Sequence, residues 1–135
     1  MGFELEMILR LLLAVVLGAI IGYQRERVGK AAGLRTHALI CVGAALFTIG
    51  SLYGFGVGVD PSRVAAGIVT GIGFLGAGAI LHREKGIVEG LTTAACIWAV
   101  AGIGLAAGAG LYLLSAVTAA IVLIVLLLPH PIIKL

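Results

Sequence analysis

The stretch VDPSRVAAGIVTGIGFLGAGAI, residues 59–80, contains two charged residues, Asp60 and Arg63, directly ahead of an apolar run. That run holds five glycines, although each glycine destabilises an isolated helix by about 1 kcal/mol relative to alanine. Within a bilayer, helices associate through close backbone approach, which small residues permit. The stretch therefore predicts a tightly packed membrane-spanning helix.

The composition of the whole chain agrees with this prediction. Of its 135 residues, 61% are hydrophobic and only 11% are charged, whereas a soluble domain carries about 25% charged residues. There is too little polar surface to cover a globule in water, so lipid must be the solvent for most of the chain. We expect an all-α fold, a polytopic integral membrane protein with glycine-rich, tightly packed helices.

Charged residues and helix breakers divide the chain into five apolar segments, each approaching the ~20 residues that a helix needs to cross a bilayer. The first is a retained helix rather than a signal peptide, because acidic residues precede it and basic residues follow it. We expect about five transmembrane helices in a single transmembrane domain, 1–135, at roughly 5–23, 37–56, 64–81, 91–107 and 110–128.

Basic residues concentrate in two of the loops. The loop after the first span and the loop after the third carry six of them: Arg25, Arg27, Lys30, Arg35, Arg83 and Lys85. By the positive-inside rule both loops lie in the cytoplasm, so the N-terminus faces outward and the C-terminus inward. We expect a multi-pass protein of a bacterial or archaeal cytoplasmic (inner) membrane, whose cytoplasmic loops attract anionic lipid headgroups.

Small residues predict where the helices pack. The first span has one stripe at four-residue spacing, with Gly18 and Gly22. At 100° per residue the third span has two stripes on nearly opposite faces: Gly67, Gly71 and Gly78 on one, Gly73 and Gly76 on the other. A helix with a smooth stripe on each side should be central, packed on two neighbours, one of which can be a second copy in a homo-oligomer.

Two pairs of charged residues flank the spans. Glu6 and Arg10 are placed one turn apart for an ion pair on the packed face. An arginine inside a span is a candidate functional residue, but Arg10 can also extend outward to Glu6 and the interface. Asp60 can start the third helix as its N-cap, or its charge and that of Arg63 can contact an ion or a headgroup.

Other chemical sites are weakly indicated. His37, Cys41, Cys96 and His82 offer soft ligands, which suit zinc or copper rather than magnesium, and packing explains them, so we expect no metal site. No serine has a base at a readable spacing, so we expect no enzyme. We also expect no cofactor beyond an association with Mg²⁺, and no nucleic-acid partner.

Three strings resemble the MgtC/SapB family of membrane proteins: GYQRERVGKAAGLRTHALICVGAALF, DPSRVAAGIVTGIGFLGAGAI and GLTTAACIWAVAGIG. The resemblance extends from about Gly18 to Ala116, and GLRTH and GIGFLGAG are its most specific parts. Motif matches in the first basic loop, before the third span and at the fourth span supply the functional candidates: Arg25, Glu26, Arg35, Thr36, His37, Asp60, Arg63, Thr92 and Thr93.

The resemblance implies an inner-membrane protein of about five spans, linked to growth in low magnesium and, in some pathogens, to survival inside host cells. Many members carry a soluble cytoplasmic C-terminal domain, for which these 135 residues leave no room. We therefore expect a short member of the family, whether naturally short or trimmed.

The sequence is consistent with two functions. One is a non-enzymatic regulator or adaptor that acts through contacts with other membrane proteins during magnesium or acid stress. The other is an oligomeric Mg²⁺ channel or transporter with Asp60 and Arg63 at its outer mouth. The lack of an acidic residue in the middle of any span favours the first. Glycines that let backbone carbonyls reach a pore favour the second.

Overall fold

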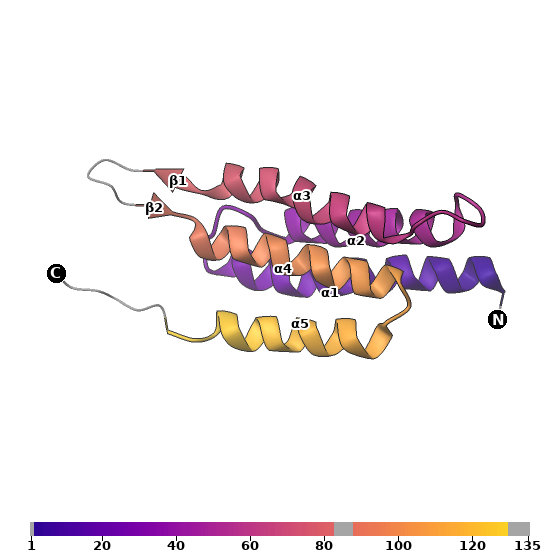
Figure 1. Cartoon of the computed structure of the whole chain (residues 1–135). Coiled ribbons are helices and arrows are strands. Elements are labelled where there is room, and N and C mark those ends of the chain that lie inside the picture. The colour runs from indigo at the N-terminus through magenta and orange to yellow at the C-terminus, as the bar shows by residue number, and fades with distance from the viewer. Residues whose placement is uncertain (1, 83–87, 130–135) are drawn as a thin grey trace.

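The computed structural model describes residues 2–82 and 88–129. These residues form five helices, whose bounds are α1 (Phe3–Arg27), α2 (Leu34–Tyr53), α3 (Ser62–Ala79), α4 (Leu91–Gly108) and α5 (Tyr112–Leu126). Successive helices run in opposite directions along one common axis (Figure 1). The arrangement confirms the predicted all-α fold class.

Four of these helices, α1 to α4, are long and apolar enough to cross a membrane. The fifth, α5, is apolar but has 15 residues, or about 22 Å at 1.5 Å per residue. Large apolar side chains point away from the protein, as Phe74 and Leu113 do with 79% and 78% of their surface exposed. Because water disfavours such a surface, the chain is a polytopic membrane protein.

The helices match the predicted spans in order but differ at some ends. The third span was predicted to continue to residue 81, but α3 ends at Ala79 because a short hairpin follows it. Strand β1 (Leu81–His82) pairs antiparallel with β2 (Val88–Glu89). The second span was predicted to continue to residue 56, but α2 ends at Tyr53. Gly56 and Gly58 then take positive φ angles of 86° and 85° in the turn, a conformation that favours glycine.

The predicted basic loop after the third span falls largely outside the described residues. Arg83 and Lys85, which contributed to the predicted orientation, belong to that part of the chain.

The first basic loop is described, and it begins with a glycine-capped helix end. Gly29 has a φ of 75° and donates its N–H to the Glu26 carbonyl at 3.1 Å, while the Lys30 N–H bonds the Arg25 carbonyl at 3.0 Å. This pair of bonds closes the end of α1.

The core lies between α1, α2 and α4, and close backbone contact holds it together. A Cβ atom built on Gly18 would lie 2.7 Å from the His37 carbonyl oxygen, and one on Gly22 would lie 2.7 Å from the Gly33 carbonyl oxygen. Helix α4 approaches α2 in the same way. A Cβ on Gly108 would lie 2.5 Å from the Ala45 carbonyl oxygen, and Gly104 sits directly against the Cys41 carbonyl. Only glycine fits these four positions.

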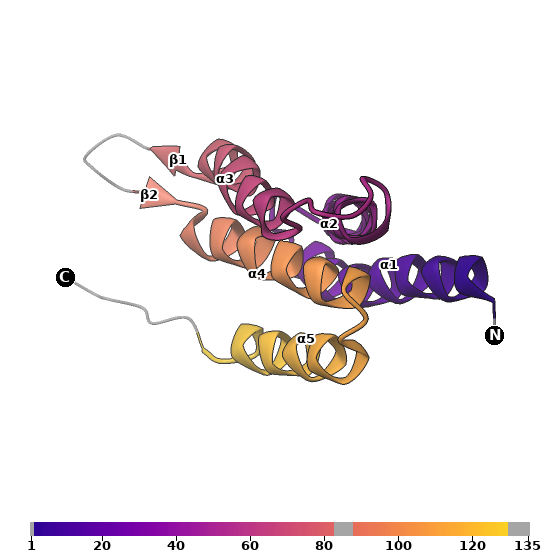
Figure 2. The same ribbon diagram turned by 45° about the vertical axis from the view of Figure 1, so that its right-hand side comes forward.

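The prediction that the third span is the central helix is wrong. Around Gly67, Gly71, Gly73 and Gly78 a Cβ would meet no atom of the described chain within 4 Å. Gly76 alone is buried, and its Cβ would stand 3.7 Å from that of Ala94, an ordinary contact. Helix α4 takes the central place instead, between α3 and α5 (Figure 2), because Gly104 and Gly108 let it reach the backbone of α2.

Candidate functional site

The end of α4 is closed by a tight reversal that leaves one carbonyl for a distant partner. Gly110, with a φ of 83°, donates to the Ala107 carbonyl at 3.1 Å, and the Leu111 N–H bonds the Ala106 carbonyl at 2.9 Å. These bonds form the glycine-terminated cap that is common at helix ends. The carbonyl of Gly108 accepts instead from Arg10 of α1, at 2.9 Å.

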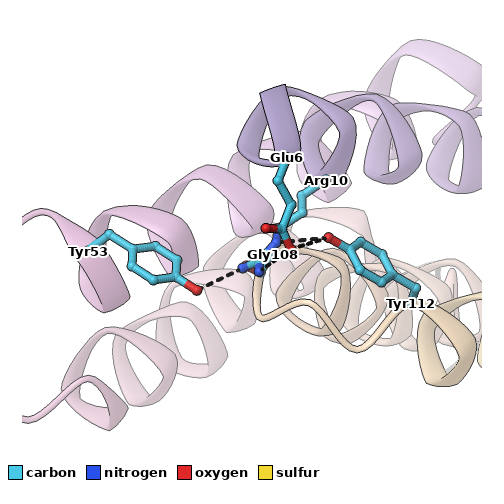
Figure 3. A network of polar contacts seen from close by, with 5 residues as sticks. All are labelled: Glu6, Arg10, Tyr53, Gly108 and Tyr112. Atoms are coloured by element: carbon cyan, nitrogen blue, oxygen red, sulfur yellow. Dashed lines mark hydrogen bonds and ion pairs between the residues drawn. The ribbon is translucent and has the colours of Figure 1, made fainter. Parts of the chain in front are cut away.

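Arg10 is the centre of a polar cluster that joins four helices, here called the Arg10 cluster: Glu6, Arg10, Tyr53, Gly108 and Tyr112 (Figure 3). Its Nε donates to the Tyr112 hydroxyl at 3.1 Å, and its Nη1 donates to the Tyr53 hydroxyl at 3.3 Å. Its Nη2 pairs with the Glu6 carboxylate at 3.0 Å. The Tyr112 hydroxyl also donates to Glu6, at 3.0 Å, which closes the cluster.

The tyrosine rings add to the binding of the guanidinium. The Cζ of Arg10 lies 5.6 Å from the ring centre of Tyr53 and 5.9 Å from that of Tyr112, within the range of cation–π attraction. Its positive charge also complements the negative end of the α4 dipole. The cluster therefore fastens the start of α1 to the ends of α2 and α4 and to the start of α5.

The sequence predicted only part of this cluster. The predicted pairing of Arg10 with Glu6 is present, but Arg10 is 6% exposed and turned toward α4, not outward to the interface. The reason is that three further acceptor atoms face it from α2, from α4 and from α5. Neither tyrosine was among the residues predicted for a site. Both tyrosines lie near the ends of predicted spans, on the same side of the membrane as Glu6. Tyrosine is enriched at such interfacial positions, and this was the sequence signal that could have indicated them.

A second buried arginine lies at the opposite end of α1. Arg25 is 4% exposed, and its Nη2 donates to the Thr93 hydroxyl of α4 at 3.1 Å. His37 is fully buried, and its Nδ1 donates to the Gly33 carbonyl at 2.9 Å. We call Arg25, His37 and Thr93 the Arg25 cluster. His37 and Cys96 both lie near the Arg25 guanidinium.

The Arg25 cluster is less completely bonded than the Arg10 cluster. Within residues 2–82 and 88–129, the Nε of Arg25 and the Nε2 of His37 are buried without a hydrogen-bond partner. Because a carbonyl only accepts, the Nδ1 of His37 carries the proton and its Nε2 presents a lone pair in the neutral ring. A donor and an acceptor thus remain in one buried region at this end of the helices.

The other candidates of this region lie on the surface. The structure brings Arg25, His37 and Thr93 together. It leaves four candidates at the same end of the bundle exposed: Glu26, Arg35, Thr36 and Thr92. Cys41 and Cys96 are free and buried. Among the residues that the structure describes, no three His, Cys, Asp or Glu side chains group closely enough to hold a metal ion.

Asp60 and Arg63 are exposed at the start of α3. The Oδ1 of Asp60 accepts hydrogen bonds from the backbone N–H of Ser62 at 2.9 Å and from its hydroxyl at 2.7 Å. These bonds hold the pKa of Asp60 below its usual value, with a smaller contribution from Arg63. Pro61 already has helical angles, so Asp60 occupies the position of a helix cap.

Several known bacterial proteins are similar to most of this chain. The family model described as the MgtC family matches residues 11–135. A relative from Escherichia coli K12, "Putative magnesium transporter YhiD", is 52% identical over 132 residues, which cover 93% of this chain and 61% of the relative. Protein SapB of Bacillus subtilis is 40% identical over 79% of this chain and 49% of its own length. Protein MgtC of Salmonella typhimurium LT2 is 52% identical over 76% of this chain and 43% of its own length.

The chain thus spans about half the length of the curated relatives it matches. No solved structure matches it. The long apolar helices and the bacterial relatives identify a bacterial membrane protein. Since the family model covers nearly all of the sequence, this chain belongs to the MgtC family.

Proposed function

We propose that this chain is a non-enzymatic protein of the bacterial inner membrane that serves adaptation to low magnesium and stress through contacts with other membrane proteins. One observation carries the proposal. Arg10 and Arg25 are about 22 Å apart along α1. In the layer of the bundle between these two levels, the described helices bear no charged side chain. Mg²⁺ binds carboxylates with water, and the described acidic residues all lie at helix ends, in the loop before α3 or in the β1–β2 hairpin.

The two arginine clusters support the same proposal. The guanidinium groups of Arg10 and Arg25 bond to α4 at its two ends, through the Gly108 carbonyl and the Thr93 hydroxyl. Groups used in this way hold helices together and do not face a path through the protein. A regulator or adaptor needs a stable scaffold with an exposed contact surface, and the open faces of α3 offer one.

The relatives support the link to magnesium, and the charge pattern supports the proposed orientation in the membrane. One relative is named for magnesium transport. The basic residues between α1 and α2 place that loop in the cytoplasm by the positive-inside rule, with the N-terminus outside. In this orientation the Arg10 cluster lies at the outer side of the membrane, and the Arg25 cluster lies at the cytoplasmic side, near anionic headgroups.

The second candidate is an oligomeric Mg²⁺ channel or transporter. The observation that favours it is the exposure of α3, on which Gly67, Gly71, Gly73 and Gly78 have no neighbour in the described chain. A second copy could cover such a face, and Asp60 and Arg63 would then line an outer mouth. The name of the Escherichia coli relative also favours transport.

Magnesium flux separates the two candidates. Liposomes containing a Mg²⁺-sensitive dye would be reconstituted with the chain and, in parallel, with Asp60→Asn. We expect no flux above that of empty liposomes, together with restored low-magnesium growth of a bacterium that lacks its own copy. Flux that Asp60→Asn abolishes would establish the channel instead. A strictly monomeric mass in mild detergent would exclude a ring-shaped pore.

A further inference from the structure

An apolar groove lies between α2 and α3, open to the surroundings of the protein. Its volume is about 600 Å³. Leu39, Gly43 and Phe47 line it from α2, and Gly67, Gly71 and Leu75 line it from α3. Helix α3 packs against α4, so the end of α3 that precedes β1 lies away from α2 (Figures 1 and 2).

The groove is closed at one end and wide along its length. At the start of α3, the Ser51 hydroxyl of α2 donates to the Pro61 carbonyl at 2.8 Å, which ties the two helices together. Further along, a Cβ built on Gly43, Gly67 or Gly71 would meet no atom within 4 Å. These glycines therefore leave room in the groove and do not mediate contact between the two helices.

Positive charge lies at the open end. Arg35, Leu39, Gly43 and Phe47 follow one another at four-residue steps, so they share one face of α2. Arg35 is exposed. The first turn of α2 has no acidic residue of its own, and the Glu26 carboxylate of α1 lies beside its N-cap, Gly33. The exposed guanidinium of Arg35 is therefore the group that attracts an anion to the mouth of the apolar groove.

We propose that this groove binds an acyl chain of an anionic phospholipid from the cytoplasmic leaflet, with the phosphate at Arg35. The groove wall from Leu39 to Phe47 is about 12 Å long, close to the ~15 Å of one hydrocarbon leaflet. A transmembrane helix would instead need a groove open along the whole bilayer, and the Ser51–Pro61 bond closes one end. At the closed end Asp60 lies near Arg63 and offsets its charge, so the described residues leave an unpaired positive charge at the Arg35 end, as an anionic lipid requires.

The proposal goes beyond the proposed function. It uses the proposed orientation, but it holds equally for a regulator and for a transporter. Labelling of a single cysteine placed in the Arg27–Lys30 loop, in intact cells, tests the orientation by itself. A wrong orientation would move the lipid to the other leaflet. Mg²⁺ flux, which would overturn the regulator proposal, would leave the lipid site unaffected, so the two failures can be told apart.

The test is native mass spectrometry of the chain released from nanodiscs with equal phosphatidylglycerol and phosphatidylethanolamine. We expect one retained phosphatidylglycerol on the wild type. Gly71→Leu, which fills the groove, should remove it, and Gly73→Leu is the matched control, since Gly73 is equally open but does not line the groove. Arg35→Gln should lower the preference for phosphatidylglycerol about fivefold, equivalent to the ~1 kcal/mol of one basic residue near anionic lipid.

Several outcomes would overturn the proposal. Equal lipid retention by Gly71→Leu and Gly73→Leu would exclude the groove as the site, and no preference for the anionic lipid would exclude Arg35 as its headgroup contact. A dimer mass that only Gly71→Leu removes would show that a second copy occupies the groove. Helicity by circular dichroism checks folding. If Gly71→Leu fails to fold, Gly43→Leu fills the groove from the opposite wall, and lipid retention by that variant is equally decisive.

Discussion

Helices α3 and α4 are both rich in small residues, yet they occupy opposite environments. In α4, Gly104 and Gly108 touch the backbone of α2, and the helix is the most buried of the four long ones. In α3, four of five glycines have open space where a side chain would be. The comparison teaches that a small-residue face permits close approach but does not specify a neighbour. That face is a packing surface in α4, and in α3 it is a wall of a groove and an exposed surface.

The largest expected effect separates the two glycine environments. Gly104→Ala forces a Cβ against the backbone of Cys41, which cannot move aside, so we expect a loss of about 3 kcal/mol or more in unfolding free energy. Gly71→Ala adds a Cβ in open space and should be neutral or stabilising by up to ~1 kcal/mol, because alanine favours the helix. Chemical unfolding in detergent, followed by circular dichroism, measures both. Equal losses would mean that α3 is packed in the assembled protein.

Arg10 offers the next comparison, with Arg63 as its exposed counterpart. Arg10→Gln removes a donor that serves several helices and leaves the Gly108 carbonyl unpaired, which should cost about 1–3 kcal/mol. Arg10→Lys should not restore stability, because an ammonium lacks the planar fork that reaches these partners. Arg63→Gln should change stability by no more than ~0.5 kcal/mol. Thermal unfolding of the three variants in one detergent would contradict the cluster if Arg10→Gln and Arg63→Gln behaved alike.

The third comparison uses two adjacent threonines at the start of α4. Thr93→Val keeps the shape of the side chain but removes the hydroxyl that accepts from buried Arg25, so we expect a loss of about 1–2 kcal/mol. Thr92 is exposed, and Thr92→Val should stay within ~0.5 kcal/mol of the wild type. The same unfolding assay serves for both. A larger effect at Thr92 would indicate that the exposed threonine, not the buried one, has the structural partner.

The smallest effect is expected at Asp60, at the edge of the bundle. Asn caps a helix as well as Asp does, so Asp60→Asn should leave stability at neutral pH nearly unchanged. Because the folded state lowers the pKa of Asp60, its contribution is present above the unfolded pKa of about 3.9. That contribution is lost as the pH falls through the lower folded pKa. Stability curves of the two proteins should therefore coincide at pH 7 and separate only toward pH 3, where the wild type loses this contribution and Asp60→Asn does not.

Local patterns in the sequence determined much of this protein. Hydropathy and loop charge predicted the membrane class and the order of the helices, because these properties depend on neighbours along the chain. The spacing of Glu6 and Arg10 placed the two on one helix face for the same reason. The motif strings between about Gly18 and Ala116 also indicated the family without any knowledge of the geometry.

Only the tertiary structure decided which polar and small residues meet. Arg10 bonds Gly108 and Tyr112, which are 98 and 102 residues away in the chain, and Arg25 bonds Thr93 from a distance of 68 residues. No periodicity within one helix contains that information. Burial is a property of two facing surfaces, so the glycines of α3 and α4 look alike in the sequence, and the packing of α4 on α2 distinguishes them.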